Sequence, residues 1–282
     1  MQNLFEFDRL NFLTAGMPIA TGKGSYPKAF EILEELELDG IELEFVHGVR
    51  MNDATRKLVN ETAKAKNMIL TAHCPYYINL NAREEEKIEA SIRYIVDTAK
   101  AAKDVGAYSI VYHAAFYLNQ DKETVFKKVL KQTEKIVEIV KIENIQTWIR
   151  PETTGKGTQW GDLDEVIKLS KEFDCVLPCV DFAHLHARSN GQFNTREEFS
   201  RIFEKIGNEL GQYALDNFHG HLAGIAYSEK GEKHHLILEE SDMNYKELIQ
   251  VMKEFKVKGV LTCESPNIEG DAKLLKEYYM SL

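Results

Sequence analysis

The chain has 282 residues, of which 44% are hydrophobic and 28% charged, and it carries a formal net charge of −10. This is the composition of an ordinary globular protein, and the length suits one α/β barrel of about 250 residues. The acidic balance argues against a general nucleic-acid coat protein, whose affinity would come from neutralised phosphates. No apolar run reaches the roughly 18 residues of a transmembrane helix, and the four cysteines are unpatterned, which is typical of a reduced protein. We therefore expect a cytoplasmic protein with no membrane partner.

Apolar runs alternate with amphipathic helical runs from one end of the chain to the other. The runs that predict strands cover residues 10–19, 40–46, 68–74, 109–114, 146–152, 176–182, 218–225 and 259–264. The clearest helical runs cover residues 29–36, 83–105, 122–142, 163–173, 196–210, 245–255 and 272–280, and a weaker one covers 53–66. Such alternation implies parallel βαβ units. Eight predicted strands indicate an α/β protein built as a single (β/α)8 TIM barrel over residues 1–282.

Histidines and acidic residues gather where the predicted strands end. Of the nine histidines, nearly all lie at the end of an apolar run or in the loop after one. The two long irregular stretches, residues 187–194 and 226–244, also follow such runs. Because loops after strands form the C-terminal face of a barrel, these side chains predict one pocket on that face. In chain order they are His73, His113, Glu152, Asp181 with His184, His219 with His221, Glu232 with His234 and His235, and Glu264.

Imidazole and carboxylate groups together suit zinc, iron or manganese. Gathered at an apolar barrel mouth, they would repel or neutralise one another without a counter-charge, which divalent cations supply. Carboxylates on three separate strands also allow one of them to bridge two ions, an arrangement used in phosphoryl displacement. Residues three apart, such as Asp181 and His184, point to opposite faces of a strand, but a strand that stops near Asp181 can aim both inward. The pattern therefore predicts a metal centre at the C-terminal face.

The sequence around these residues is distinctive. It reads His73-Cys-Pro-Tyr76-Tyr-Ile-Asn79-Leu, Pro-Glu152-Thr-Thr-Gly-Lys-Gly, Val-Asp181-Phe-Ala-His184, His221-Leu-Ala-Gly and Glu264-Ser-Pro. Taken together, from about the second predicted strand to the end, these segments resemble the endonuclease IV family of apurinic/apyrimidinic (AP) endonucleases. That family lies within the xylose-isomerase-like barrel superfamily.

The resemblance implies three zinc ions, with manganese or iron as alternatives. Glu152 would bridge two ions, one also held by His73 and His113 and the other by Asp181, His221 and Glu264. The third ion would be held by His184 with an acid-x-His pair, here Glu232 and His234, where the bacterial pattern has Asp. His235 is an alternative to His234, because a one-residue shift in the loop would present it instead. His219 is an alternative to His221, which is favoured because the Leu that follows it resembles the continuation of the family motif.

The resemblance also implies an activity. In the family, the metals hold the phosphate 5′ to an abasic sugar and activate the attacking water, and Glu152, the candidate catalytic residue, would accept its proton. Tyr76 resembles a position beside the abasic site, and Arg50 lies near a DNA-contacting loop of the family. We therefore expect a zinc-dependent AP endonuclease of base excision repair, a monomer that acts on DNA containing abasic sites.

Two further acidic residues, Glu42 and Glu44, end the second predicted strand. Their charge would repel DNA and suits a sugar isomerase or epimerase better, and Lys and Arg are sparse on the strand-end loops. A metal-dependent sugar isomerase or epimerase on the same barrel is therefore the alternative hypothesis. A non-catalytic protein that binds damaged DNA or nucleotides is a third.

Overall fold

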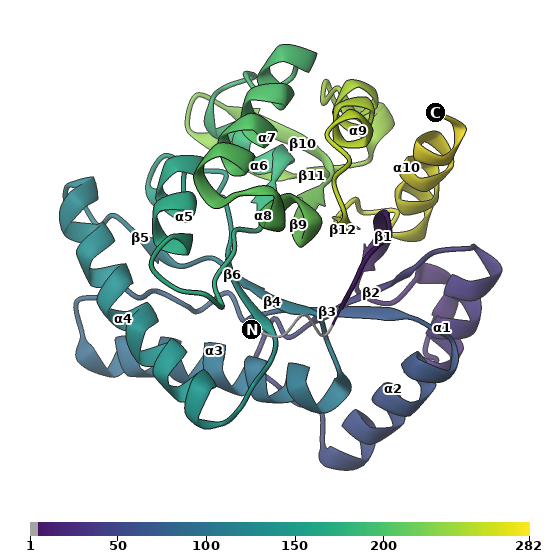
Figure 1. The fold of residues 1–282 in the computed structure, drawn as a ribbon, viewed down its shortest axis with the longest axis horizontal. Coiled ribbons are helices and arrows are strands. Elements are labelled where there is room, and N and C mark those ends of the chain that lie inside the picture. Colours follow the sequence, from purple (N-terminus) through teal and green to yellow (C-terminus); the bar gives the residue numbers. More distant parts are fainter. Residues whose placement is uncertain (1–4) are drawn as a thin grey trace.

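The computed structural model describes residues 5–282 and places a parallel eight-stranded sheet at the centre of the molecule (Figure 1). The strands are β1 (Leu10–Ala15), β2 (Gly40–Glu44), β3 (Ile69–His73), β4 (Ser109–Tyr112), β6 (Trp148–Pro151), β8 (Val180–Asp181), β9 (Phe218–Leu222) and β12 (Gly259–Cys263). They pair in the order β6-β4-β3-β2-β1-β12-β9-β8. Bridges from Ile149 to Val176 and from Glu152 to Cys179 join β6 to the segment before β8, so the sheet curls into a barrel. The predicted α/β barrel is confirmed.

Helices follow the strands and cover the outside of the barrel (Figure 1). They are α1 (Tyr26–Glu35), α2 (Asp53–Ala65), α3 (Glu85–Val105), α4 (Lys122–Ile142), α5 (Leu163–Ser170), α6 (Phe182–Arg188), α7 (Arg196–Leu210), α8 (Gln212–Asp216), α9 (Tyr245–Glu254) and α10 (Glu269–Ser281). Capping boxes start α5 and α7, because Asp162 and Thr195 each exchange hydrogen bonds with a Glu three residues later. Within residues 5–282, no helix combines the length and apolarity that crossing a membrane requires.

Local backbone geometry corrects two predicted strand boundaries and one stretch that was predicted to be irregular. The first strand ends at Ala15 rather than at residue 19, since Gly16 takes a positive φ of 78°. The strand predicted over 176–182 stops at Asp181, whose side chain caps α6 by accepting a hydrogen bond from the His184 N–H at 2.7 Å. The stretch 226–244, predicted irregular, contains most of a hairpin of β10 (Gly224–Ser228) and β11 (Gly231–Leu236) and the 3-10 turn η2 (Leu238–Glu240). The small pair β5 (Ala115–Phe116) and β7 (Gln159–Trp160) was also not predicted.

The buried interior contains a polar layer below the C-terminal rim. Glu42, Thr71, Ser109, His219 and Thr262 are all fully buried there. Close polar contacts join them: Thr71 Oγ1 donates to Glu42 Oε2 at 2.7 Å, and Ser109 Oγ lies 2.7 Å from His219 Nδ1. The layer therefore supports side chains at the rim with hydrogen bonds as well as with apolar packing.

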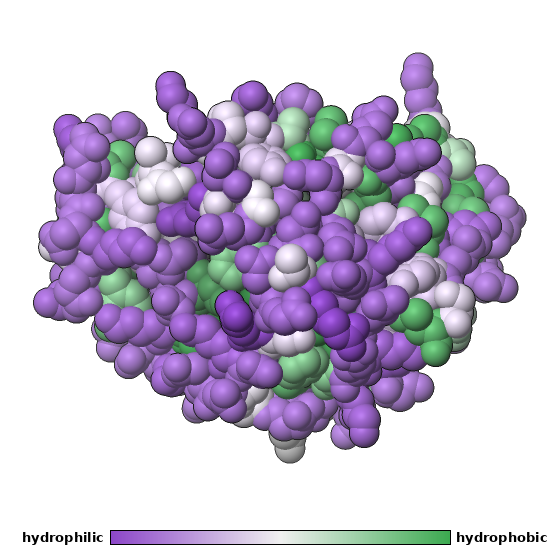
Figure 2. All heavy atoms as spheres, turned by 90° about the horizontal axis from the view of Figure 1, so that it is seen from above, coloured by the Kyte–Doolittle hydropathy of each residue, from purple (hydrophilic) through white to green (hydrophobic). Residues whose placement is uncertain are grey.

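Near the N-terminal ends of the strands, the buried Arg150 guanidinium donates to the carbonyl oxygens of Pro178 and Asn217 and to Tyr108 Oη. On the outside, the face seen from above Figure 1 is mostly hydrophilic, with hydrophobic residues in small separate groups (Figure 2). This is typical of a surface in contact with water.

Gly259 offers a test of how tightly the barrel strands approach. It begins β12 with a φ of 125°, and a Cβ there would lie 2.1 Å from the Phe218 carbonyl oxygen. Gly259→Ala should lower the free energy of unfolding by about 2–4 kcal/mol, combining backbone strain with overpacking. Urea unfolding measures this free energy for Gly259→Ala and for a control, Gly157→Ala. A Cβ at Gly157 would meet nothing within 4 Å. Equal effects in the two variants would contradict this packing.

Candidate metal centre

The predicted ligands lie together at the C-terminal ends of the barrel strands. His73 ends β3, Asp181 ends β8 and His221 lies within β9. His113, Glu152 and Glu264 lie one or two residues beyond β4, β6 and β12. The structure thus brings six of the nine predicted ligands to one rim directly from the strands. The remaining positions come from α6, which begins right after Asp181, and from the β10–β11 hairpin.

Glu152 is at the centre of this cluster and is fully buried. Its Oε2 atom lies 3.1 Å from the Nε2 atoms of both His73 and His113. Its Oε1 atom lies 3.2 Å from His184 Nδ1 and 3.4 Å from His221 Nδ1. One carboxylate therefore faces four imidazoles from four different segments, which is the position expected of a bridging ligand.

The side chains form overlapping groups whose nitrogen and oxygen atoms lie within 4.8 Å of one another. Ligand atoms that share a tetrahedral zinc ion at about 2.0–2.1 Å lie roughly 3.3 Å apart, close to the separations around Glu152. Two groups contain Glu152 itself, which joins them. The groups are His73, His113 and Glu152; Glu152, Asp181, His221 and Glu264; and Asp181, His184 and His235.

Each of three histidines has one ring nitrogen close to a backbone carbonyl oxygen. His73 Nδ1 lies 2.8 Å from the Cys74 oxygen, His184 Nδ1 lies 2.9 Å from the Thr153 oxygen, and His235 Nδ1 lies 3.2 Å from the Glu264 oxygen. A carbonyl oxygen only accepts, so Nδ1 carries a proton and donates it, and Nε2 is the nitrogen that a metal ion would use. This arrangement orients metal-ligating histidines in proteins.

Several polar atoms of the cluster are buried without a hydrogen-bond partner in the described part of the chain. They are Glu152 Oε1, Asp181 Oδ2, His221 Nδ1 and Nε2, His235 Nε2 and, in the layer below, Glu42 Oε1. Buried polar groups are normally paired, since an unpaired one costs about 1–3 kcal/mol. Acceptor atoms left unpaired together at a barrel mouth fit bound cations, so the residues present suit the metals that the sequence predicts.

The third group differs from the prediction in two residues, because it holds His235 in place of His234 and Asp181 in place of Glu232. His234 is exposed, whereas its neighbour His235 joins Asp181 and His184. The cause is a β-bulge, because Tyr227 pairs with Glu232 while Ala226 pairs with His234, so Lys233 is an extra residue on β11. The bulge turns Glu232 and His235 to the same face of the hairpin, and Glu232 Oε2 lies 3.6 Å from His184 Nε2.

His219, the alternative to His221, lies one layer deeper. Its Nε2 atom is 3.3 Å from Glu42 Oε2, and burial lowers its pKa to about 4 against the opposing effect of Glu42. His221 instead lies 3.3 Å from Glu264 Oε1 through Nδ1 and 3.0 Å from Glu42 Oε1 through Nε2. The structure therefore places His221 in the cluster and His219 in the layer that supports it. His219 and His221 also lie close to the Cys179 thiol, as a separate buried group.

Charges in the cluster strongly perturb one another. Burial opposes the charged form of His73, but its contact with Glu152 and the field of the neighbouring carboxylates raise its pKa to about 10. Burial would raise the pKa of Glu152, but the imidazoles of His113 and His221 foremost hold it well below its ordinary value. Burial, with the like charges of Asp181 and Glu152, raises the pKa of Glu264. Such opposed shifts are typical of functional sites.

The two predicted substrate-binding residues lie near each other at the rim beyond β2 and β3. Tyr76 is 65% exposed, and its ring lies edge-on to His47 at 6.3 Å between centroids. Arg50 is exposed and lines a groove with His47 and Glu44. By contrast, Arg188 is held by the loop after Glu152, since its Nη1 donates to Lys156 O at 2.6 Å.

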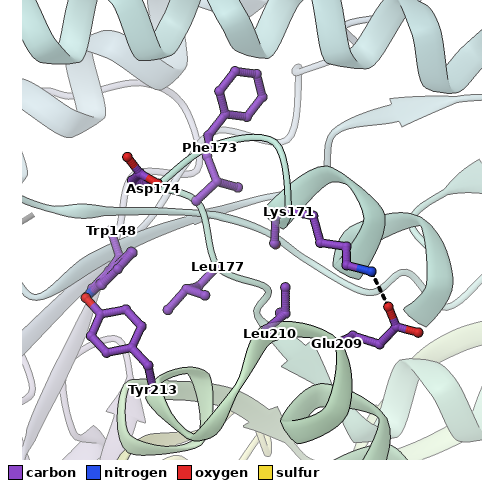
Figure 3. A pocket seen from close by; sticks show the side chains of 10 residues that line it. Trp148, Lys171, Phe173, Asp174, Leu177, Glu209, Leu210 and Tyr213 are labelled. Carbon is purple, nitrogen blue, oxygen red and sulfur yellow. Dashed lines mark hydrogen bonds and ion pairs between the residues drawn. The ribbon is translucent and has the colours of Figure 1, made fainter.

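A larger hollow, of about 720 Å³, lies at the N-terminal ends of the strands (Figure 3). Trp148 and Tyr213 meet edge-on at one side of it, and a Lys171–Glu209 ion pair lies at the other. Its lining residues include no histidine. The chemistry of this chain is therefore concentrated at the opposite end of the barrel.

The bulge in β11 predicts different effects for two adjacent histidines. His235→Ala should reduce the number of tightly bound zinc ions per chain, because it removes a nitrogen from the third group. His234 is exposed, so His234→Ala should leave that number unchanged. Elemental analysis of both proteins after dialysis against zinc-buffered solution measures it. Loss of zinc in His234→Ala alone would show that the hairpin has the other register.

Because Glu42 contacts His221, replacement of Glu42 should change the affinity of the site for metal. Replacement of a carboxylate that orients a ligating histidine typically weakens metal binding by about 10–100-fold, and we expect Glu42→Gln to fall in this range. Competition with a chromophoric zinc chelator measures the affinity, with Glu35→Gln on the exposed end of α1 as control. An unchanged affinity in a folded Glu42→Gln protein would remove Glu42 from this role.

Comparison with known proteins agrees with this architecture. A family described as xylose isomerase-like TIM barrel matches residues 30–279. An uncharacterized protein of Methanocaldococcus jannaschii is 43% identical over 97% of this chain and 98% of its own length. A probable endonuclease 4 of Mycoplasma pneumoniae is 28% identical over 50% of each chain.

Two solved structures share the fold. A D-tagatose 3-epimerase-like protein has a TM-score of 0.73 at 20% identity, covering 95% of this chain and 97% of its own. Endonuclease IV from Thermus thermophilus has a TM-score of 0.72 at 16% identity, covering 97% of this chain and 100% of its own. With the family match extending over most of the sequence, the chain belongs to the xylose isomerase-like TIM barrel family.

Proposed function

We propose that this protein is a metal-dependent AP endonuclease that hydrolyses the phosphodiester bond 5′ to abasic sites in DNA. The observation that carries the proposal is the grouping of ligands around Glu152. Beyond the set of Glu152, Asp181, His221 and Glu264, the rim adds imidazoles on both sides of Glu152, enough to hold three ions rather than one. Sites with adjacent ions are used to clamp both oxygens of a phosphodiester during in-line displacement.

The ions would be held by the residues of the three groups together with Glu232, whose Oε2 atom lies 3.6 Å from His184 Nε2. His73 and His113 would share one ion with Glu152; Asp181, His221 and Glu264 would share the second with it; and His184, His235 and Glu232 would hold the third. When bound, zinc supplies charge to the phosphate oxygens and a lowered pKa for water. The ligand set also suits manganese or iron.

Protein groups would contribute orientation and proton transfer. Glu152 Oε1 is buried without a hydrogen-bond partner, and the imidazoles around it keep the carboxyl deprotonated. This atom is therefore positioned to accept a proton from an attacking water. Tyr76 and Arg50 lie on the open rim beside the ligands, where an exposed ring and a guanidinium can contact a sugar and a neighbouring phosphate.

The comparisons support this proposal in part. Relatives that carry the name probable endonuclease 4 match about half of this chain, and an endonuclease IV structure shares the fold over 97% of it. On this proposal the substrate is duplex DNA with abasic sites, and the protein works as a cytoplasmic monomer in base excision repair.

The substitution Glu152→Gln tests the proposed catalytic role of the central carboxylate. Zinc-loaded protein should nick a duplex that carries one abasic site, and the variant should be about 10²–10⁴-fold slower, because it loses the proton acceptor. Its fold should survive, since the barrel core lies below the rim. The nicking rates measure the loss of activity, and thermal unfolding of the variant checks that its fold is intact. No nicking by zinc-loaded wild-type protein would end the nuclease proposal, and full activity in the variant would exclude Glu152 from catalysis.

A sugar isomerase or epimerase is the second candidate function. Glu44 favours it, since it places negative charge at the rim, where a phosphate backbone would pass. Structures of several epimerases also share the fold, with TM-scores of 0.64, 0.67 and 0.69, as does an epimerase-like protein with a TM-score of 0.73. In that case Glu152 and Glu264, which share one ligand group, would act as acid and base on a sugar. Metal content separates the two, because the epimerase needs one ion in that group and the nuclease needs three.

A further inference from the structure

Glu44 differs from the other acidic residues at the rim. It is the last residue of β2 and pairs with His73 of β3, so it lies at the level of the ligands. Glu152, Asp181, Glu232 and Glu264 each have an imidazole nitrogen within 3.6 Å. Glu44 has no ion-pair partner within 4.0 Å among residues 5–282, and it belongs to none of the metal-ligand groups found there. Its carboxylate is therefore left without a direct ion-pair partner in the described part of the chain.

The carboxylate is also incompletely hydrogen-bonded. Glu44 Oε1 is buried and has no hydrogen-bond partner in the described part of the chain. The side chain as a whole is half-buried, because it lines a groove of about 330 Å³ that opens at the rim. A buried acceptor without a partner, next to an open groove, points to a donor supplied by a ligand.

The groove has the lining of a small sugar subsite. Tyr26 and His47 form part of its walls, and Arg50 lies at its exposed end. Tyr76 and Tyr77 extend the aromatic surface, because the His47 ring lies 6.2–6.3 Å from both of theirs and His47 Nδ1 is 3.0 Å from Tyr77 Oη. Carboxylates accept hydrogen bonds from hydroxyl groups but repel phosphate oxygens. A hydroxyl-bearing part of a ligand would therefore fit beside Glu44.

Under the proposed function, the chemistry of DNA identifies that hydroxyl. Within a strand, the 3′ and 5′ oxygens of deoxyribose are esterified, so an abasic residue has one free hydroxyl, on C1. An intact nucleotide carries its base at C1 and has no hydroxyl there. We propose that Glu44 is a specificity-determining residue that accepts a hydrogen bond from the C1 hydroxyl of a deoxyribose bound in this groove. This inference rests on the proposed nuclease function for the identity of the sugar.

Binding of two small sugars tests the inference without requiring turnover. The probes are 2-deoxyribose 5-phosphate and its analogue without the C1 hydroxyl, titrated calorimetrically into the zinc-loaded full chain. Wild-type protein should bind the hydroxyl-bearing sugar about 10–100-fold more tightly, the range for one hydrogen bond to a charged group. Glu44→Ala should lose this preference, whereas Glu35→Ala, which removes an exposed carboxylate of α1, should retain it.

The Glu44→Ala variant should fold as stably as the wild-type protein. Burial foremost raises the pKa of Glu44, the charge of His73 opposes this, and the like charges of Glu42 and Glu152 add to it. Because the charged carboxylate is disfavoured on balance, its removal should not lower the melting temperature, which is measured alongside. Equal binding of the two sugars by wild-type protein, no binding of either, or an unchanged preference in Glu44→Ala would each overturn the inference. A preference that depends on Glu44, in a protein that nicks no abasic duplex, would instead support the sugar subsite and refute the nuclease proposal.

Discussion

Four imidazoles around the carboxylate of Glu152 form the constraint on which the rest of the rim depends. The carboxylate is fully buried, and burying an unpaired ion costs several kcal/mol. Protons on the imidazoles supply the opposite charge when no cation is present, which is why the pKa of His73 is raised to about 10. Divalent ions use the same lone pairs, so protons and metals compete for this cluster.

The surrounding structure serves to aim these side chains. Backbone carbonyls hold the Nδ1 atoms of His73 and His184, and Asp181 both caps α6 and faces the cluster. Below them, Glu42 lies 3.0 Å from His221 in a layer where most barrels have branched apolar side chains. This polar layer makes the centre rigid at its base, while Tyr76 and Arg50 remain exposed at the rim.

Fold alone does not separate the two candidate functions. The epimerase-like and endonuclease IV structures have TM-scores of 0.73 and 0.72 with this chain, and one barrel supports many chemistries. The distinction lies in the side chains. The imidazoles that flank Glu152 favour a site with several ions and a phosphodiester substrate, whereas Glu44 marks a place for a hydroxyl group. On the proposed nuclease function, an abasic nucleotide would supply both the phosphodiester and the hydroxyl group.

Much of the fold and of the candidate site could be predicted from the sequence. Apolar periodicity located all eight barrel strands, and because parallel strands end on one face, it also predicted that His73, Glu152 and Glu264 would converge. Local chemistry with no periodic signature could be named only as an open alternative, as were a strand that stops near Asp181 and a one-residue shift that presents His235. The side chain of Asp181 ends its strand and starts α6, and one extra residue in β11 presents His235 instead of His234. Such a shift reverses which face a side chain occupies, and it depends on how the hairpin pairs and packs on α6. The role of Glu42 beneath His221 likewise follows from contacts between distant strands. The spacing of residues along the chain does not show which side chains share a layer inside a barrel.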